Sequence, residues 1–425
     1  MKKIVSLVVL LIAAGGIYWF LLRDRPVGQP VSKPNINNNE DGLGFLSVPE
    51  GFKISLAADG LDNPRVIAFD EKNRILVSET KAGRVSVLED KDKDGEYEDK
   101  QTLIKDLMSP HGLAFFVSGN TTYLYIAETH QVVRYPYNIN TGKLTETIGE
   151  NIATLPSDGR HVTRTISFGP NWRDKNLVKG QEFLGGFYSS LKLYISVGSS
   201  CDVCEETTWK RGAILESDPD GTFTGEFAGG LRNAVFFTFH PETYEIWATD
   251  MGRDNLGDDL PPDEINIVKV ADPKQHKFGA RRFGWPFCYG NKVKDNTFNP
   301  EKVERIDIPT NCSETDAPVI EIPAHSAPLG LAFVDSDKWP KDWQKDLLVA
   351  YHGSWNRSEP TGYKIVRFKV DKNGKVFETE DFITGWLSQN KKKVYGRPVD
   401  LKFGPDGALY VSDDAAGIIY KLESK

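Results

Sequence analysis

Pro64-Arg65-Val66-Ile67-Ala68-Phe69, followed by Ile75-Leu76-Val77-Ser78-Glu79, is the stretch that decides the fold. It is an apolar run that ends in Phe, then a turn, then an aliphatic strand that ends in a polar or acidic residue. The pattern recurs along the chain, with the apolar run ending at Phe115, Phe168, Phe239, Phe333 and Phe403. Short strands rich in Val, Ile, Phe and Tyr, separated by Gly, Asp, Asn and Pro turns, are typical of all-β proteins. Six repeats of this size predict a six-bladed β-propeller.

The two ends of the repeat array are expected to meet. An apolar strand, Phe52-Lys53-Ile54-Ser55-Leu56, precedes the first repeat, and the chain ends on Gly417-Ile418-Ile419-Tyr420-Lys421-Leu422. A ring without open sheet edges forms if the N-terminal strand completes the last blade. Repeats are spaced by about 46 to 95 residues, against roughly 40 to 50 for an ordinary blade. We therefore expect insertions, the longest at 200–230 and 252–325.

Composition excludes one broad class of partner. A length of 425 residues suits a single repeat domain, and the formal net charge is −8. An acidic chain of this kind does not offer a general nucleic-acid surface, so no nucleic-acid partner is expected.

The N-terminus predicts a membrane connection. Residues 4–22 form a 19-residue uncharged run after Lys2 and Lys3, which is long enough to span the hydrocarbon layer as a helix. Residues 1–23 are predicted to be an uncleaved anchor, with a cleaved signal peptide or a buried helix as the alternatives. Residues 24–44 are rich in Pro, Asn and Gly and predict a flexible tether, which leaves 45–425 for the propeller. This predicts a periplasmic or otherwise extracytoplasmic protein tethered to the inner membrane.

Four cysteines suit an exported protein with two disulfides. Three pairings are possible, and the sequence-local one joins Cys201 to Cys204 and Cys288 to Cys312. The Cys201-Asp202-Val203-Cys204 segment could instead be redox-active or bind a metal, but no second such segment completes a zinc site.

Charged residues gather at one position of the repeat. In a propeller the start of the innermost strand and the end of the next strand reach the same face. Residues at these positions are expected to converge on one funnel. At or before the start of the first strands they are Arg65, His111, His161, Arg164, Arg232, His325 and Arg397, and at the ends of the second strands they are Glu79, Glu128, Asp250 and Asp413. Converging arginines are costly unless an anion binds there. In the alternative, each arginine pairs with an acidic residue of a neighbouring blade.

Several motifs lie in order on these blades. They are Gly159-Arg160-His161, Gly230-Leu231-Arg232-Asn233, Asp250-Met251-Gly252-Arg253-Asp254 running to Pro262-Asp263-Glu264-Ile265-Asn266, and Phe283-Gly284-Trp285-Pro286. Together they resemble the soluble quinoprotein glucose/sorbosone dehydrogenase family over roughly residues 45–423. His352-Gly353-Ser354-Trp355-Asn356-Arg357 and Gly396-Arg397-Pro398 are similar to its sorbosone-dehydrogenase branch.

This resemblance implies a propeller that binds pyrroloquinoline quinone (PQQ) and calcium in its axial funnel. By position, His161 would be the general base, Arg232 would stabilise the developing oxyanion, and Asn233 would hold the neighbouring edge of the cofactor. The backbone carbonyls of Gly252 and Arg253 would bind calcium. Further cofactor or sugar contacts would come from Arg65, Arg164, His325, His352, Trp355, Arg357 and Arg397, with Arg397 holding a cofactor carboxylate. A hydrogen-bonded core histidine is the structural alternative for His325 and His352.

The implied reaction is oxidation of an aldose or sugar aldehyde, with electrons passed to a respiratory quinone or cytochrome. Arg160 and Thr163 replace the acidic and Gln residues that glucose dehydrogenases of the family carry, which disfavours glucose. Two other functions stay open. One is a calcium-dependent lactone hydrolase that uses Glu79, Glu128, Asp250 and Asp413 around an axial metal, and the other is a propeller that binds a glycan or protein without chemistry.

A separate acidic loop is a second candidate metal site. Asp90, Asp92 and Asp94 have the spacing of an EF-hand loop, and Glu98 takes the ninth position. Gln101 takes the twelfth position, where an EF-hand carries a bidentate Glu. The loop therefore predicts either a calcium-bound turn or a plain solvated hairpin.

Overall fold

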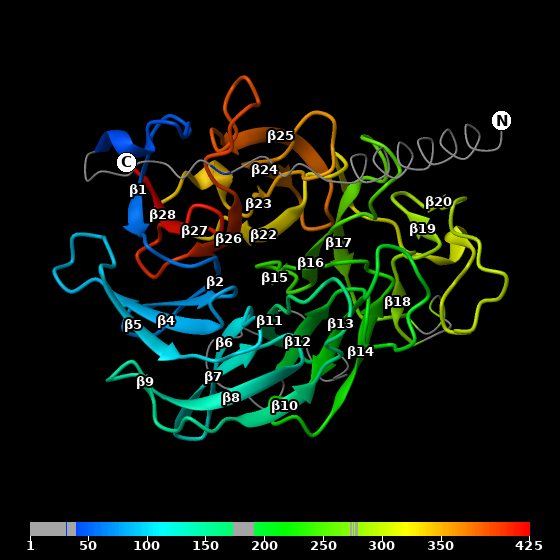
Figure 1. Ribbon diagram of the computed structural model, residues 1–425, viewed down its shortest axis with the longest axis horizontal. Helices are drawn as coiled ribbons and strands as arrows, with labels where there is room; N and C mark the ends of the chain where they lie inside the picture. Colours follow the sequence, from blue (N-terminus) through cyan, green and yellow to red (C-terminus); the bar gives the residue numbers. More distant parts are fainter. Residues whose placement is uncertain (1–30, 32–39, 173–190, 273, 275, 277–278) are drawn as a thin grey trace, which may run out of the picture.

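The computed structural model describes residue 31 and residues 40–172, 191–272, 274, 276 and 279–425. In these residues six sheets of four or five strands are arranged as a ring (Figure 1). Helical structure there is limited to short 3-10 turns, η1 (Glu40–Leu43), η3 (Cys312–Glu314) and η4 (Lys341–Trp343). No helix among the described residues is long and apolar enough to cross a membrane. The predicted anchor and most of the tether lie outside the described residues.

The first three blades follow the chain in order. Blade 1 contains β2 (Pro64–Phe69), β3 (Ile75–Glu79), β4 (Arg84–Glu89) and β5 (Asp99–Ile104). Blade 2 contains β6 (Leu113–Ser118), β7 (Thr121–Ala127), β8 (Gln131–Asn138), β9 (Lys143–Leu144) and β10 (Glu150–Thr154). Blade 3 contains β11 (Ile166–Pro170), β12 (Leu191–Val197), β13 (Ala213–Ser217), β14 (Thr224–Gly229) and β18 (Arg281–Arg282).

The last three blades complete the ring. Blade 4 contains β15 (Phe237–Phe239), β16 (Ile246–Asp250), β17 (Asp263–Val268) and β21 (Ile320–Ile322). Blade 5 contains β22 (Pro328–Phe333), β23 (Leu347–Tyr351), β24 (Lys364–Val370) and β25 (Val376–Ile383). Blade 6 contains β26 (Pro398–Phe403), β27 (Leu409–Asp413), β28 (Ile418–Ser424) and β1 (Phe52–Ala58).

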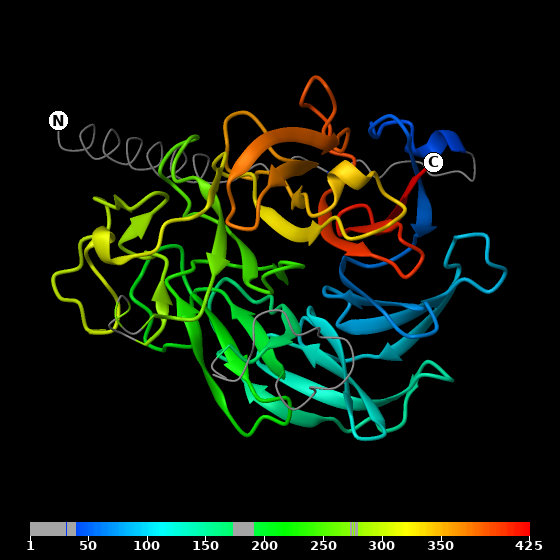
Figure 2. The same cartoon turned by 180° about the vertical axis from the view of Figure 1, so that it is seen from behind.

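The predicted ring closure is confirmed. Strand β1 pairs antiparallel with β28, from Phe52 opposite Ser424 to Ala58 opposite Ile419. In the reverse view the red C-terminal strand lies beside the blue strand β1 (Figure 2). The pairing removes an exposed strand edge that would otherwise be open to intermolecular pairing.

The long spacings are only partly insertions. Residues 213–229 form β13 and β14, the ordinary third and fourth strands of blade 3, so the insertion predicted at 200–230 is wrong over that part. The region 252–325 likewise contains β17 and β21 of blade 4. Between those two strands the chain adds β18, which pairs parallel with β14 of blade 3, and a hairpin of β19 (Cys288–Tyr289) and β20 (Val293–Lys294). This segment therefore joins blades 3 and 4 beside the ring.

The core lies between the blades. Leu76, Leu124, Trp247 and Leu347 come from blades 1, 2, 4 and 5, are completely buried, and belong to one hydrophobic cluster. Because apolar packing occupies the faces of the sheets, the polar positions of the repeat are left at the ends of the strands. Figure 1 shows β2, β6, β11, β15, β22 and β26 nearest the centre of the ring, so the loops that lead into them surround its axis. Both predicted disulfides, Cys201–Cys204 and Cys288–Cys312, are formed.

Candidate active site

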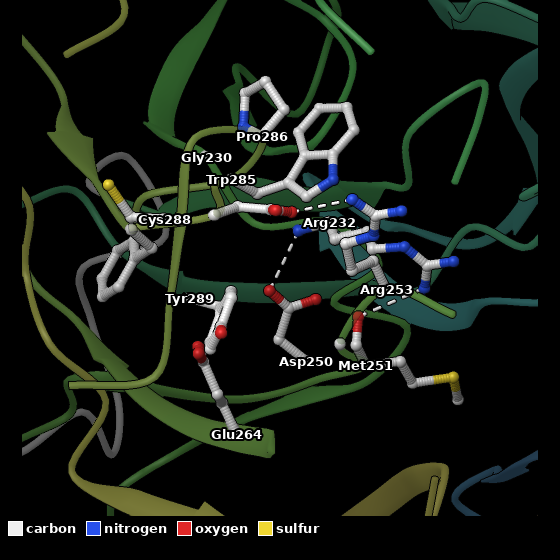
Figure 3. Close-up of a pocket in the computed structure, with 13 residues that line it drawn as sticks. Gly230, Arg232, Asp250, Met251, Arg253, Glu264, Trp285, Pro286, Cys288 and Tyr289 are labelled. Carbon is white, nitrogen blue, oxygen red and sulfur yellow. Dashed lines mark hydrogen bonds and ion pairs between the residues drawn. The ribbon is translucent and has the colours of Figure 1, made fainter. Parts of the chain in front are cut away.

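The acidic residues that end the second strands accept hydrogen bonds from backbone N–H groups. Asp250 accepts hydrogen bonds from the backbone N–H groups of Arg232 (2.9 Å) and Asn233 (2.6 Å), and Figure 3 shows the first of these. Asp413 accepts the N–H of Arg397 (2.8 Å) in the same way. Equivalent contacts join Glu79 to the N–H of Asp62 (2.7 Å) and Glu128 to the N–H of Met108 (2.6 Å). These side chains therefore fix the loops that present the arginines and histidines.

His161 has a defined tautomer. Its Nδ1 lies 2.8 Å from the carbonyl oxygen of Ser199 and 3.0 Å from Ser199 Oγ. A carbonyl oxygen only accepts, so Nδ1 carries the proton and Nε2 carries the lone pair. Burial and then the positive charge of Arg232 lower the pKa of His161 to about 3. The ring is thus neutral at ordinary pH, with Nε2 able to accept a proton.

Arg232 is held by carboxylates from two loops. Its Nη2 lies 2.8 Å from Asp202 Oδ1 and 3.2 Å from Asp254 Oδ2. Its Nε donates to the carbonyl of Asp202 (3.0 Å) and its Nη1 to the carbonyl of Met251 (3.3 Å). The guanidinium is therefore fixed, and its charge is partly balanced.

Asn233 and His161 meet above the end of strand β12. A Cβ atom added to Gly198 would lie 2.5 Å from Asn233 Oδ1 and 2.6 Å from His161 Cβ. Only glycine allows both side chains to come this close. The structure therefore brings the predicted base, Arg232 and Asn233 to one place.

A second charged group joins blades 1, 5 and 6. Asp414 lies 2.7 Å from Arg65 Nη1 and 2.9 Å from His352 Nε2. Burial alone would raise the pKa of Asp414, but His352 and Arg65 hold it well below its usual range. Arg397 donates to the Gly353 carbonyl (3.1 Å) and the Tyr363 hydroxyl (3.0 Å). Among the described residues its guanidinium has no carboxylate partner, so Arg397 keeps an unbalanced charge.

In the predicted calcium loop, residues 252 and 253, the backbone at Gly252 lies close to Pro261 and Pro262. Gly252 donates its N–H to Asp263 Oδ1 (2.9 Å), and a Cβ there would lie 2.8 Å from both Pro261 Cγ and the Pro262 carbonyl. The Arg253 side chain points to Asp295 (2.8 Å) and Thr297 (2.9 Å). In the part of the chain that the structure describes, the carbonyl oxygens of Gly252 and Arg253 accept no hydrogen bond. They are thus available as ligands.

A cavity lies behind this loop, lined by Gly230, Arg232, Asp250, Met251, Gly252, Arg253, Glu264, Phe283, Trp285, Pro286, Cys288, Tyr289 and Asp295 (Figure 3). The Trp285 indole donates to the carbonyl of Asp202 (3.2 Å), which also accepts from Arg232. The insertion after β17 therefore supports Arg232 from behind.

Arg164, predicted to contact the cofactor, binds backbone carbonyls in this structure. Its side chain is completely buried and donates to the carbonyls of Thr129 (3.1 Å), His161 (2.8 Å), Thr163 (2.8 Å) and Pro156 (2.8 Å). Burial and then the charge of Arg211 lower the pKa of Arg164 to about 9. The guanidinium holds the loop that carries His161, and its cofactor role stays a prediction.

Three other predicted contacts lie at the rim of this face. His325 Nε2 is 2.8 Å from the Gly257 carbonyl, and Arg357 pairs with Asp259 (2.8 Å). Trp355 is 40% exposed and free to meet a ligand. The roles of these residues stay predictions.

The acidic loop of blade 1 lies between β4 and β5. Asp90, Asp92, Asp94 and Glu98 place one carboxylate oxygen each within 4.8 Å of one another. Asp90 also accepts the backbone N–H groups of Lys93 (2.7 Å) and Gly95 (3.0 Å). These contacts are those of a hairpin turn as well as of a calcium loop, so calcium binding here stays a prediction.

The main residues missed from the sequence are Asp202, Asp254, Asn356 and Asp414. Asp254 and Asn356 lie inside the quoted motifs and bind each other (2.9 Å), which joins blades 4 and 5. Asp202 lies within the Cys201–Cys204 segment. Asp414 directly follows Asp413, and the two side chains bind different partners, Asp413 the N–H of Arg397 and Asp414 the side chains of Arg65 and His352.

Comparisons with known proteins agree with this geometry. A protein of Borreliella burgdorferi described as uncharacterized is 29% identical over 387 residues, 90% of this chain and 92% of its own. A protein of Hypocrea jecorina described as a pyrroloquinoline quinone-dependent sugar dehydrogenase is 24% identical over 407 residues, 88% of each chain. A calcium structure of a Trichoderma reesei enzyme of carbohydrate-active enzyme family AA12 has the same fold, with a TM-score of 0.70, 22% identity and coverage of 93% of this chain and 98% of its own. The family model described as TrAA12-like matches residues 46–425. The chain therefore belongs to the TrAA12-like family.

Proposed function

We propose that this protein is a PQQ-dependent dehydrogenase that oxidises an aldose or sugar aldehyde. The observation that carries the proposal is the pairing of a neutral His161, whose Nε2 is free to accept a proton, with the fixed guanidinium of Arg232. The relative from Hypocrea jecorina supports the cofactor and the substrate class. A sorbosone-like substrate is the finer form of the proposal.

The donor set fits the cofactor and its metal. PQQ carries three carboxylates, and Arg397 offers a partly exposed guanidinium without a carboxylate partner among the described residues. Arg65 has a buried Nε with no hydrogen-bond partner, which is one further donor beside Asp414. Calcium prefers oxygen ligands, and the carbonyls of Gly252 and Arg253 are available. Arg65, Asn233 and Arg397 would hold the cofactor, and the 252–253 loop would hold calcium.

The side chains of this protein can perform the proton step. Bound PQQ with calcium would supply the electrophile that accepts hydride from the sugar carbon. His161 Nε2 takes the proton of the sugar hydroxyl, while Nδ1 remains bonded to Ser199. Arg232 stabilises the negative charge that develops beside it, and because its position is already fixed it needs no reorganisation. The positive charge of Arg232 lowers the pKa of His161, and a negative charge developing beside Arg232 offsets this lowering. The basicity of Nε2 therefore rises as the proton is transferred.

The lactone-hydrolase alternative is not favoured. Its metal cage requires free carboxylates from Glu79, Glu128, Asp250 and Asp413, but each of these accepts backbone N–H groups or pairs with another side chain. A binding scaffold without chemistry offers no reason for the fixed tautomer of His161. We further propose that the protein works outside the cytoplasm, tethered by its N-terminal segment, and passes electrons to a respiratory quinone or cytochrome.

Reconstitution tests the proposal. Apo-protein incubated with PQQ and calcium should reduce an artificial dye when aldoses or sugar aldehydes are added. His161→Ala should lower kcat by at least about a hundredfold, the usual contribution of a general base, while calorimetry still detects cofactor binding. His276→Ala is the matched control, because His276 binds Asp272 and Asp316 away from this face and should keep full activity. Absence of PQQ binding to the wild type would overturn the proposal.

A further inference from the structure

The loop closed by the Cys201–Cys204 disulfide lies between strands β12 and β13, on the face that carries His161 and Arg232. The disulfide closes a very small ring, with a sequence separation of 3. A ring of this size restricts the backbone dihedrals of the residues inside it, so its carbonyl groups have fixed directions. The Asp202 carbonyl accepts a hydrogen bond from Arg232, and the Cys201 carbonyl accepts one from Ser199, which contacts His161.

Asp202, inside the ring, binds Arg232 twice. Its carbonyl oxygen accepts from Arg232 Nε (3.0 Å), and its Oδ1 accepts from Arg232 Nη2 (2.8 Å). The same Oδ1 accepts the backbone N–H of Asp254 (2.8 Å), so Asp202 also fixes the second carboxylate partner of Arg232. Two contacts from one rigid residue define the plane of the guanidinium.

Cys201, at the other side of the ring, acts on His161 through Ser199. Ser199 Oγ donates to the Cys201 carbonyl (2.7 Å), and the carbonyl and Oγ of Ser199 both face His161 Nδ1. Because Ser199 Oγ uses its proton for Cys201, it can only accept from the imidazole. The proton of His161 is therefore held at Nδ1.

Ser200 attaches the loop to the segment that carries His161. Its carbonyl accepts the N–H of Arg160 (2.8 Å), and its Oγ donates to the buried carboxylate of Glu206 (3.0 Å). Gly159 packs directly on it, since a Cβ there would lie 2.5 Å from Ser200 Cα. The histidine segment and the disulfide loop thus form one packed unit.

We propose that the Cys201–Cys204 loop is a positioning device for the reaction, in which Asp202 orients the Arg232 guanidinium and Cys201, through the Ser199 hydroxyl, supports the Nδ1–H tautomer of His161 that the Ser199 carbonyl also requires. Asp202 and Ser199 are positioning residues, since they act through Arg232 and His161. This inference rests on the proposed function for its catalytic meaning. Its structural part concerns the apo-protein alone and is tested separately.

The first experiment measures His161 without cofactor. Long-range ¹H–¹⁵N NMR of ¹⁵N-histidine-labelled protein reports the tautomer and the pKa of each imidazole, and the His161→Ala spectrum identifies the signal of His161. We expect the wild type to show the Nδ1–H tautomer and no protonation of His161 at pH 5, because its pKa is lowered to about 3. In the variant Cys201→Ser/Cys204→Ser the released loop should allow both tautomers and raise the pKa of His161 toward the value of an exposed histidine. An unchanged tautomer and pKa in a folded variant would overturn the inference.

The second experiment separates orientation from folding. Asp202→Ala should lower kcat about a hundredfold with KM unchanged, the cost of misplacing a group that acts in the transition state. Asp202→Asn keeps the side-chain acceptor and should lose clearly less activity. Glu150→Gln removes the exposed partner of Arg134 on the rim of blade 2 and should match the wild type, which controls for loss of an acidic residue as such.

The two proposals fail in different ways. If the wild type binds no PQQ but the NMR result holds, the proposed function is wrong and the positioning role stands. If the wild type oxidises sugars and Asp202→Ala does so at the same rate, the positioning role of Asp202 is wrong and the enzyme assignment stands. Should the double cysteine variant not fold, as judged by circular dichroism, the NMR measurement is made on Ser199→Ala, which keeps the Ser199 carbonyl but removes the hydroxyl link between Cys201 and His161. A shifted pKa or tautomer population of His161 is then expected, and an unchanged His161 signal would overturn the role of Cys201.

Discussion

Glu264 is a buried carboxyl group beside the site, and its ionisation makes the free energy of unfolding depend on pH. It lies on β17, is 6% exposed, and accepts hydrogen bonds from the Gly290 N–H (2.7 Å) and the Asn266 amide (3.0 Å). Burial, with the nearby charge of Glu321, raises the pKa of Glu264 to about 7. The folded protein therefore holds the proton at a pH where the unfolded chain has released it.

Glu264→Gln should reduce the pH dependence of stability. Below the unfolded pKa of 4.5 both states are protonated, and the stability contributed by the native proton is fully present. It is lost as the pH rises through the folded pKa, so the wild type should lose about 3 kcal/mol between about pH 4 and pH 8 that the Gln variant keeps. Urea unfolding of both proteins at several pH values measures the difference, which also includes the part that Glu264 contributes to the raised pKa of Asp250 and of Asp263. Parallel curves would contradict the raised pKa.

For single residues, the sequence predicts that the polar side chains lie on one face of the propeller. It does not predict which of these side chains bind backbone groups. Arg65, His161, Arg232 and Arg397 could be predicted because they lie at or before the start of the first strands of the repeat. Arg164 has the same placement, yet it is buried on four carbonyls. Whether an arginine faces a loop or a ligand depends on the folding of non-local segments, and the repeat pattern contains no information on that.

Strand β1 closes the ring and also ties blade 6 to blade 5. Phe52, its first residue, is 5% exposed and packs on Trp339 (ring centroids 4.8 Å apart), Trp343 (5.1 Å) and Phe382 (5.9 Å). These partners lie around the outer strands of blade 5. One N-terminal side chain therefore stabilises the junction of two blades.

Phe52→Ala should destabilise the protein by about 3 to 5 kcal/mol, the usual cost of truncating a buried Phe. Phe377→Ala is the matched control, since Phe377 lies on the outer strand of the same blade 5 and is 65% exposed. The control should change stability by less than about 0.5 kcal/mol. Equal midpoints of denaturant unfolding for the two variants would mean that β1 contributes little to ring closure.

Most elements were predictable because the repeat is local. The apolar runs and turns gave six pairs of inner strands, and the strand left over at the N-terminus predicted the closure. The pairing of β18 with β14 was not predictable, since it joins residues more than fifty positions apart through an irregular loop. Asp202 was missed for the same reason, because its partner Arg232 lies 30 residues away on another blade.

Across the whole molecule, charged contacts on the site face join five of the six blades in succession, from blade 3 through blade 6 to blade 1. Asp202 of blade 3 binds Arg232 of blade 4, and Asp254 of blade 4 binds Asn356 of blade 5. Asp414 of blade 6 binds both His352 of blade 5 and Arg65 of blade 1. A ligand on this face therefore contacts loops that belong to several blades, and its binding energy acts on the ring as one unit.

Cofactor binding should accordingly stabilise the whole ring. With PQQ and calcium at about a hundred times the dissociation constant, linkage adds about 2.7 kcal/mol to the free energy of unfolding. Hydrogen exchange should slow together at the start of β2 and in the loops before β15 and β26, because Arg65, Arg232 and Arg397 lie there. Arg397→Ala should abolish most of the gain in stability, while Lys369→Ala, which removes a partner of Glu378 on blade 5, should keep it.

Removal of calcium with a chelator should reverse the gain in stability if the carbonyls of Gly252 and Arg253 bind the ion. Protection limited to one blade would show that the ligand does not lie on the axis.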